Sequence, residues 1–141
     1  MFNVRVYALL IHENKIMLSD ESYAGRNFTK FPGGGLQFGE GTIDCLKREF
    51  REEFDWDIEI TSHFYTTDFF VESAFNSKQQ VLSIYYLIEN KNPHQLDFEF
   101  LKSNEENATL HWKPLSLLSS EDVTFPIDKK VVELLNKQFD Y

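Results

Sequence analysis

The sequence has little cysteine, no long hydrophobic run and no excess of basic residues. Its single cysteine, Cys45, excludes a disulfide within the chain and any metal site built from cysteines. The apolar run at residues 6–11 is shorter than the core of a signal peptide and far too short to span a bilayer, which predicts a cytoplasmic protein without membrane contact. With 14 Lys and Arg against 23 Asp and Glu, the net charge is −9, so neither duplex nucleic acid nor an anionic membrane is an expected partner.

The length and composition are those of one globular domain. A chain of 141 residues predicts a single domain over residues 1–141. Hydrophobic residues make up 42% and charged residues 26%, which argues against disorder. No repeat, low-complexity tract or linker-like segment divides the chain.

Hydrophobic periodicity predicts strands that alternate with two helices. Strands are expected at residues 4–11, 16–18, 58–60, 64–71, 81–88 and 110–115, and helices at residues 42–54 and from residue 126 to the end. Thr42 is the expected N-cap of the first helix. The second helix has an apolar stripe made of Ile127, Val131, Leu134, Leu135 and Phe139. Residues 20–30 are expected to form a loop and residues 31–35 an irregular segment, within an α/β layered domain.

The first helix carries three glutamates on one face. Glu49, Glu52 and Glu53 are spaced so that they share a side of the helix, next to an apolar face of Ile43, Leu46, Phe50 and Phe54. Like charges at this spacing destabilise a helix unless a cation compensates them, and hard oxygen ligands suit Mg²⁺ or Mn²⁺. The alternative is an ordinary solvated helix whose glutamates are neutralised by Arg48 and Arg51.

A glycine-rich segment precedes this helix. Gly34 and Gly39 have the spacing of a phosphate-binding P-loop, but Glu40 and Gly41 stand where that loop needs Lys and Ser or Thr. The Gly-x-Gly-x-x-Gly fingerprint of dinucleotide-binding folds is also absent. What the sequence offers is a glycine turn, a glutamate, and a helix with the pattern Arg-Glu-x-x-Glu-Glu.

This segment resembles the Nudix box, Gly-x5-Glu-x7-Arg-Glu-U-x-Glu-Glu-x-Gly-U, in which U is a bulky apolar residue. Eight of the nine fixed positions match over residues 34–56, namely Gly34, Glu40, Arg48, Glu49, Phe50, Glu52, Glu53 and Trp56. The exception is Asp55, which replaces a glycine. Because a helix often ends on a left-handed residue, for which Asp is one of the least costly substitutes, the departure is expected to leave the carboxylates in place.

The resemblance implies a single-domain Nudix-type α/β/α sandwich with a mixed sheet. It also implies a hydrolase that uses Mg²⁺ or Mn²⁺ to cleave the pyrophosphate bond of a nucleoside diphosphate linked to another moiety. By the same resemblance the metal ligands are Glu49, Glu52, Glu53 and the backbone carbonyl of Gly33 or Gly34, with Arg48 orienting the carboxylates. Gly34, Glu40 and Trp56 are expected to be structural.

The resemblance leaves the general base open. Glu53 and Glu49 are the candidates in the box, and with Arg48 they form the expected catalytic set. A glutamate from a later loop is the alternative, with Glu72, Glu105 and Glu106 as candidates.

Substrate contacts are expected from residues near the box. Arg5, Arg26, Phe31 and Gly34 are the candidates, with Lys30 as a further cation. Arg5 interrupts the first strand, where a charge must point outward or find a partner. Exposed rings can stack on a base, and Tyr23, Phe28, Phe69, Phe70 and Phe75 lie near the expected mouth of the site.

The leading function is a pyrophosphohydrolase that acts on a small nucleotide substrate: a nucleoside triphosphate, an ADP-ribose-type compound or a nucleotide sugar. The alternative is a catalytically silent domain of the same fold that senses nucleotides. RNA decapping is disfavoured because the chain has no basic stripe. Many members of the family form dimers, so a homodimer is also possible for this chain. Residues 40–59 contain three basic and eight acidic residues, a net charge of −5, which predicts that phosphate binds there only through divalent metal.

Overall fold

The computed structural model of the chain describes residues 1–105 and 107–138. Its strands are β1 (Phe2–His12), β2 (Lys15–Tyr23), β3 (Arg26–Lys30), β4 (Gly33–Gly35), β5 (Ile58–Thr66), β6 (Gln80–Asn90), β7 (Phe100–Lys102) and β8 (Ala108–Pro114). Its α-helices are α1 (Thr42–Phe54) and α2 (Pro126–Gln138), and short 3₁₀ turns lie at Pro93–Leu96, Leu115–Leu117 and Ser120–Asp122.

Strand β1 lies at the centre of the sheet. It pairs in parallel with β6 from Phe2 to Leu10, and it pairs antiparallel with β4 on its other side. Only its end, at Ile11 and His12, pairs with β2. The main strand order is β5-β6-β1-β2-β8-β7, with β3 beside β2 and β4 beside β1. The sheet is therefore mixed, as predicted, and the apolar strand predicted at residues 81–88 lies inside it.

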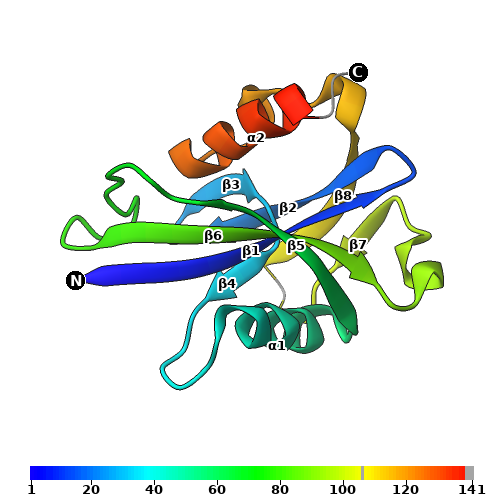
Figure 1. Ribbon diagram of the computed structural model, residues 1–141, viewed down its shortest axis with the longest axis horizontal. Helices are drawn as coiled ribbons and strands as arrows, with labels where there is room; N and C mark the ends of the chain where they lie inside the picture. Colours follow the sequence, from blue (N-terminus) through cyan, green and yellow to red (C-terminus); the bar gives the residue numbers. More distant parts are fainter. Residues whose placement is uncertain (106, 139–141) are drawn as a thin grey trace.

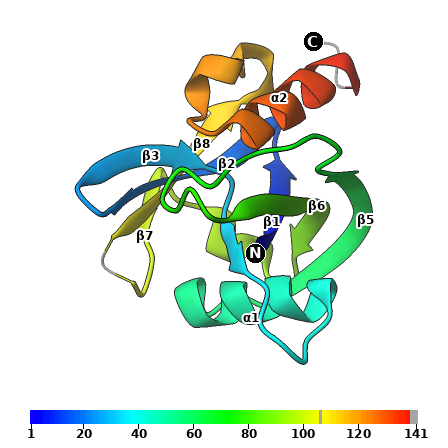
Figure 2. The ribbon, with the colours of Figure 1, turned by 90° about the vertical axis from the view of Figure 1, so that its left-hand side faces the viewer.

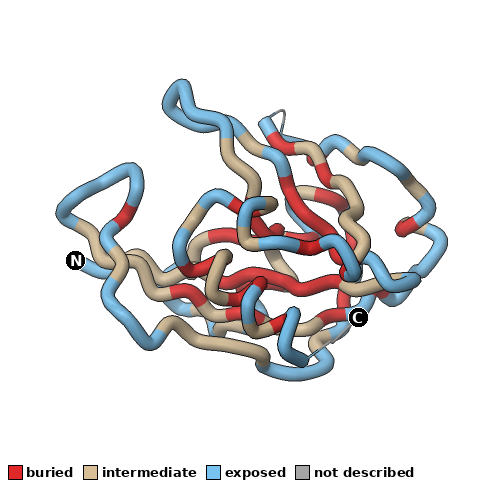
Figure 3. The backbone as a smooth tube through the Cα atoms, turned by 90° about the horizontal axis from the view of Figure 1, so that it is seen from above, coloured by how far each residue is buried: buried red, intermediate tan, exposed pale blue. Residues whose placement is uncertain are grey.

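The two helices cover opposite faces of this sheet (Figures 1 and 2). Side chains of β1 alternate between the faces, as in any strand: Val6, Ala8 and Leu10 pack toward α1, whereas Tyr7 and Leu9 pack toward α2. Each face thus has its own core, and the buried residues follow the central strands (Figure 3). This arrangement is the predicted α/β/α sandwich.

Helix α1 has the predicted bounds but not the predicted cap. Its N-cap is Gly41, which has no side chain to cap it, and Thr42 is the first helical residue, with its hydroxyl 2.7 Å from the hydroxyl of Tyr86. Its C-cap is Asp55 in the left-handed conformation, with φ 56° and ψ 39°, so the prediction for this position is confirmed. Ile43, predicted for the apolar face, is 42% exposed, and Cys45 is buried in its place.

Trp56 directly follows the C-cap of α1. It is 3% exposed, and its ring lies 5.3 Å from that of Phe54 and 6.0 Å from that of Phe98. The end of the helix is thereby attached to the core on this face.

Three other predictions for the strands were wrong. Residues 20–30 form most of the β2–β3 hairpin, which turns at Ala24 and Gly25 with positive φ. Gly33–Gly35 forms β4, because β1 offers an open edge that its backbone can pair with. The strands expected at residues 58–60 and 64–71 are one strand, β5, whose register against β6 shifts at two places. It ends at Thr66, and the exposed Phe69 and Phe70 lie in the following loop.

Helix α2 packs on the sheet through Ile127, Asp128, Val131, Val132 and Leu135, which are buried. Phe139 of the predicted stripe lies outside the described residues. In the described part of the chain, neither helix has the length and hydropathy needed to cross a membrane.

Asp128 is a carboxylic acid on the buried face of α2, and its titration affects stability. Burial raises its pKa to about 6, although the hydrogen bond from Tyr85 acts in the opposite direction. At Asp128 the folded state therefore binds more protons than the unfolded state between pH 3.8 and about 6, so the contribution of this group to stability is greatest in acid and falls as the pH rises through this window.

We expect Asp128→Asn to increase the free energy of unfolding by about 2–3 kcal/mol at pH 7.5, because the amide has no charge to desolvate. The gain should vanish near pH 4, where the wild-type carboxyl group is protonated. Urea denaturation at both pH values measures it, with the exposed Asp97→Asn as control. An equal gain at both pH values would contradict the assignment.

Candidate functional site

Strand β4 brings three glycines against the centre of the sheet. Gly33 pairs with Tyr7, and a Cβ on Gly33 would lie 2.1 Å from the carbonyl oxygen of Val6. Gly33 also has φ +152°, a conformation that side chains rarely adopt. Glycine is therefore needed at this position because one backbone lies directly on another.

Gly34 makes room for a carboxylate of α1. A Cβ on Gly34 would lie 2.4 Å from Cδ of Glu49, so the Glu49 carboxylate fills the space that a larger residue would take. The Glu49 side chain is only 14% exposed. The position of the Glu49 carboxylate against β4 thus depends on the absence of a side chain at Gly34.

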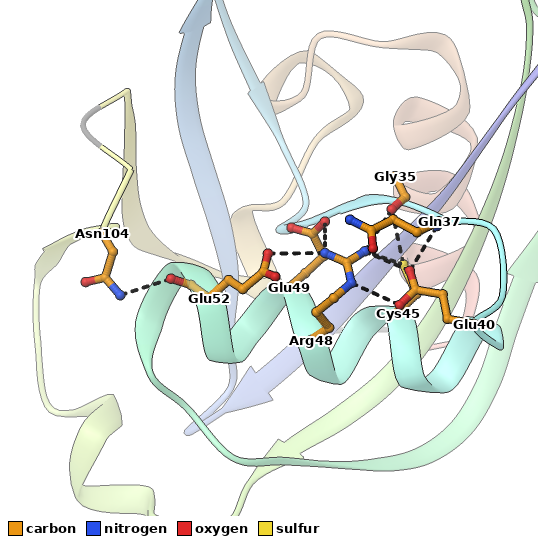
Figure 4. A network of polar contacts seen from close by, with 8 residues as sticks. All are labelled: Gly35, Gln37, Glu40, Cys45, Arg48, Glu49, Glu52 and Asn104. Carbon is orange, nitrogen blue, oxygen red and sulfur yellow. Dashed lines mark hydrogen bonds and ion pairs between the residues drawn. The ribbon is translucent and has the colours of Figure 1, made fainter.

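Arg48 connects the carboxylates with the glycine strand (Figure 4). Its Nε and Nη2 donate hydrogen bonds of 2.9 and 2.7 Å to the two carboxylate oxygens of Glu40. Its Nη1 donates to Glu49 at 3.1 Å and to Glu52 at 3.2 Å, and Nη2 also reaches the carbonyl oxygen of Gly35 at 3.1 Å. A planar guanidinium can serve all of these acceptors at once because its donors form a rigid fork.

Glu40 is held in its charged form by these contacts. The hydrogen bonds from Arg48, followed by the one from the backbone N–H of Gln37, lower the pKa of Glu40 to about 2. In the same contact the pKa of Arg48 is raised, mainly by its hydrogen bonds to Glu40. Glu40 therefore links the loop after β4 to α1 and faces Arg48.

Glu53 has the opposite electrostatic environment. Burial raises its pKa to about 8, and the negative charges of Glu49, Glu21 and Glu105 act in the same direction, whereas Lys30 opposes them. The backbone N–H of Asn104 donates to the carbonyl oxygen of Glu53 at 2.6 Å, and its side chain donates to that of Glu52 at 3.0 Å. The segment between β7 and β8 is thereby attached to the end of α1 (Figure 4).

The donors of this site suit a hard divalent cation. Within residues 1–105 and 107–138, no three His, Cys, Asp or Glu side chains already converge on one point, since Glu49 and Glu52 both contact Arg48. Burial, and after it the negative charges of Glu49, Glu21 and Glu105, disfavour the charged form of Glu53, and a bound cation would offset both effects. Carboxylate oxygens of Glu49, Glu52 and Glu53, together with the Gly33 carbonyl, could hold Mg²⁺ or Mn²⁺.

A cavity of about 560 Å³ lies on the α2 face of the sheet. Its lining comes from β1, β2, β3 and β6, from the loop at residues 71–79, and from the start of α2. Arg5 lines this cavity, and the negative charge of Glu49 raises its pKa after the larger effect of Tyr7. Arg5 therefore couples the cavity electrostatically to the carboxylates of α1.

Only some of the residues predicted to contact the substrate line the cavity. Arg5 lines the cavity, as do Lys30, Tyr23, Phe28 and Phe75, but Phe69 and Phe70 do not. Arg26 is exposed outside the lining, where its guanidinium lies 5.0 Å from the Phe75 ring centre. Phe31 is fully buried, edge-on to Tyr85, because the chain turns inward before β4. In this structure Phe31 is a core residue with no surface for a ligand, which corrects its expected role.

The candidates for a general base outside the Nudix-box segment lie in different parts of the molecule. Glu72 lines the cavity, and Glu105 is close enough to Glu53 for its charge to raise the pKa of that carboxyl group. Glu106 lies outside the described residues.

Sequence reasoning missed several polar residues of the cavity: Asn3, Tyr7, Glu21, Tyr85 and Asp128. Only Asp128 had a usable signal, because its spacing places it on the same helical face as the apolar Val131, Val132 and Leu135. The other residues are brought together by the pairing of distant strands.

The glycines of β4 predict a graded response to alanine. Gly33→Ala should reduce the free energy of unfolding by about 2–4 kcal/mol, because the new Cβ meets backbone. Gly34→Ala should change it by less than about 1 kcal/mol, since the flexible end of Glu49 can move. Gly35→Ala is the control, with no atom closer than 3.5 Å. Urea denaturation measures all three, and equal losses at Gly33 and Gly35 would contradict the packing.

Comparison with known proteins gives a consistent result. The NUDIX domain family model matches residues 1–135. No curated protein matches the sequence. Among solved structures, the Escherichia coli ORF135 protein is 16% identical with a TM-score of 0.69, over 99% of this chain and 89% of that one. The MutT protein of Methanosarcina mazei is 16% identical with a TM-score of 0.70, over 99% and 96% of the two chains.

An ADP-ribose pyrophosphatase from Streptococcus suis is 17% identical with a TM-score of 0.63, over 99% of this chain and 92% of that one. At these identities the structures establish a shared fold, and the family model extends over nearly the whole chain. The prediction of an enzyme of this family is confirmed. With the motif of residues 34–56 placed on a glycine strand and the following helix, the chain belongs to the NUDIX domain family of hydrolases.

Proposed function

We propose that this protein hydrolyses the pyrophosphate bond of a nucleoside diphosphate linked to another moiety, with Mg²⁺ or Mn²⁺ as cofactor. The observation that carries the proposal is the joint between β4 and α1, where Gly34 admits the Glu49 carboxylate and Arg48 holds it. A surface helix with solvated glutamates would not need such a joint. The proposed metal ligands are Glu49, Glu52, Glu53 and the Gly33 carbonyl.

A bound divalent cation would neutralise the pyrophosphate and lower the pKa of the attacking water. The protein's own residues have separate roles around it. Arg48 orients Glu49 and Glu52, and Glu40 keeps Arg48 in place through two hydrogen bonds. Either Glu53 or Glu49 is the proposed general base that accepts the proton of the attacking water.

The cavity on the α2 face of the sheet is the proposed site for the rest of the substrate. Its size falls in the range of pockets for small organic ligands. Arg5 and Lys30 supply positive charge on its floor, which suits the phosphates of a nucleotide. Among the structures with this fold, one is titled an ADP-ribose pyrophosphatase and another a UDP-X diphosphatase. We propose that the substrate is of this kind or is a nucleoside triphosphate.

A cytoplasmic location and a homodimer stay predictions from the sequence.

The first test is hydrolysis of a panel of nucleoside triphosphates, ADP-ribose and nucleotide sugars with Mg²⁺ or Mn²⁺. We expect Glu53→Gln to lower kcat at least about a hundredfold, because it removes a charge that acts on the reacting centre. Glu89→Gln, an exposed change on β6, is the control. Equal activity of wild type and Glu53→Gln across the panel would refute the proposal, and tight binding without turnover would favour a nucleotide-sensing domain.

Arg5 is tested separately because it lies in the cavity. We expect Arg5→Gln to raise KM for the substrate about tenfold or more, since a charged hydrogen bond to phosphate is lost. Arg51→Gln removes the same charge from the exposed surface of α1 and should leave KM within about twofold. A similar change in both variants would show that only the overall charge matters.

A further inference from the structure

The consecutive glycines of β4 leave both faces of this strand free of side chains. Successive residues of a strand point to opposite faces. A Cβ on Gly34 would meet the Glu49 carboxylate of α1. On the other face, the space beside Gly35 is taken by the Arg5 guanidinium, whose Nη1 lies 3.5 Å from the position of a Cβ on this glycine. Strand β4 is thus a thin layer with the Glu49 carboxylate on one face and Arg5 on the other.

Tyr7 has the same relation to β4 as Arg5. The two residues are separated by one position on β1, so their side chains lie on the same face of the sheet. Tyr7 is the pairing partner of Gly33, and Arg5 is that of Gly35. A Cβ on Gly33 would lie 2.9 Å from Cδ1 of the Tyr7 ring. The two glycines therefore leave room for two side chains of β1 that lie against β4.

One hydrogen bond joins these two side chains. Nε of Arg5 donates to the hydroxyl oxygen of Tyr7 at 2.6 Å, and its guanidinium carbon lies 5.7 Å from the centre of the Tyr7 ring. Tyr7 is 7% exposed, and its ring centre lies 5.4 Å from that of Tyr85 and 5.1 Å from the Lys30 ammonium. A buried and closely packed ring thus restrains an arginine side chain that would otherwise be flexible.

Within residues 1–105 and 107–138, the other donors of Arg5 have no hydrogen-bond partner. Glu21, whose charge acts on Arg5, is paired with Lys30 at 2.9 Å. Glu49, whose charge also acts on Arg5, is paired with Arg48 at 3.1 Å. Both Nη groups are therefore available to a ligand in the cavity that Arg5 lines.

We propose that Tyr7 is a positioning residue for substrate binding: its hydroxyl group holds the Arg5 guanidinium against β4 and leaves both Nη groups free for a phosphate of the substrate. This inference deepens the proposed function and rests on it for the identity of the ligand. A guanidinium can donate two parallel hydrogen bonds to a phosphate. Because Tyr7 occupies Nε, the edge that remains is the one formed by the two Nη groups. Binding is tighter when such a side chain is oriented before the ligand arrives, since less conformational freedom is lost.

The test measures dissociation constants for the α,β-methylene analogues of ADP, GDP, CDP and UDP with Mg²⁺, by calorimetry, and uses the analogue that wild type binds most tightly. We expect Tyr7→Phe to raise Kd about fivefold, because the ring stays but the guanidinium loses its fixed orientation. Arg5→Gln should raise Kd about tenfold or more. The matched control is Tyr65→Phe, which removes a hydroxyl group that donates to Asp68 at 2.6 Å outside the cavity lining. It should leave Kd within about twofold.

Combining the two changes distinguishes positioning from a structural role. If Tyr7 acts through Arg5, the double variant should bind about as weakly as Arg5→Gln alone, because the hydroxyl group then has nothing to position. A purely structural effect of Tyr7→Phe would instead add to that of Arg5→Gln. Full additivity would overturn the inference, as would an unchanged Kd in Tyr7→Phe or no binding of any analogue at millimolar concentration.

A second variant reaches the same guanidinium from β4. Gly35→Leu places a side chain where the Arg5 guanidinium lies. We expect it to raise Kd about fivefold in the wild-type background and less than about twofold in the Arg5→Gln background. An equal loss in both backgrounds would contradict the inference. This pair keeps the inference testable if circular dichroism and urea denaturation show that Tyr7→Phe does not fold.

Because binding of the analogues needs no turnover, the two proposals can fail separately. A loss of binding in Tyr7→Phe that depends on Arg5, in a protein that hydrolyses nothing, would leave the inference intact and refute the proposed hydrolysis. Hydrolysis that depends on Glu53, with the same Kd for wild type and Tyr7→Phe, would do the reverse.

Discussion

The site depends on one cation, the guanidinium of Arg48. It contacts Glu40, Glu49 and Glu52 as well as a carbonyl oxygen of β4. Without it, carboxylates at this helical spacing would repel one another, and α1 would lose the hydrogen bond from Arg48 to the Gly35 carbonyl oxygen of the glycine strand. Because the fork is planar and rigid, Arg48 also determines the direction in which Glu49 and Glu52 point. Lysine could match the charge but not this geometry.

Strand β1 connects the helix joint with the cavity. Its alternating side chains supply the core under α1 and the floor of the cavity under α2, while its edge receives β4. Arg5 and the Glu49 carboxylate therefore lie on two layers of the molecule yet interact through charge. A substrate that spans a base-sized pocket and a cluster of carboxylates would lie along this strand.

Two acids are held at a cost to the stability of the fold. Burial raises the pKa of Glu53 to about 8 and that of Asp128 to about 6, so at neutral pH both carboxyl groups oppose folding, Glu53 by taking up a proton and Asp128 by keeping its charge in a buried place. Groups that weaken a fold are often retained at functional sites. Glu53 lies at the proposed metal site and Asp128 in the cavity, which are the two places where a ligand would compensate the charge.

The sequence alone determined the family motif, the bounds of α1 and an α/β layered domain, because these follow from local spacing and hydrophobic period. The resemblance to a known family added the left-handed residue at Asp55 and the two helical layers over a mixed sheet. Only the tertiary structure decided that β4 is a strand, that Phe31 is core and that Asp128 faces a cavity. Each of these depends on backbone or side-chain partners far away in the chain. Local pattern carries no information about such partners, since strand pairing and burial are settled only when the sheet assembles.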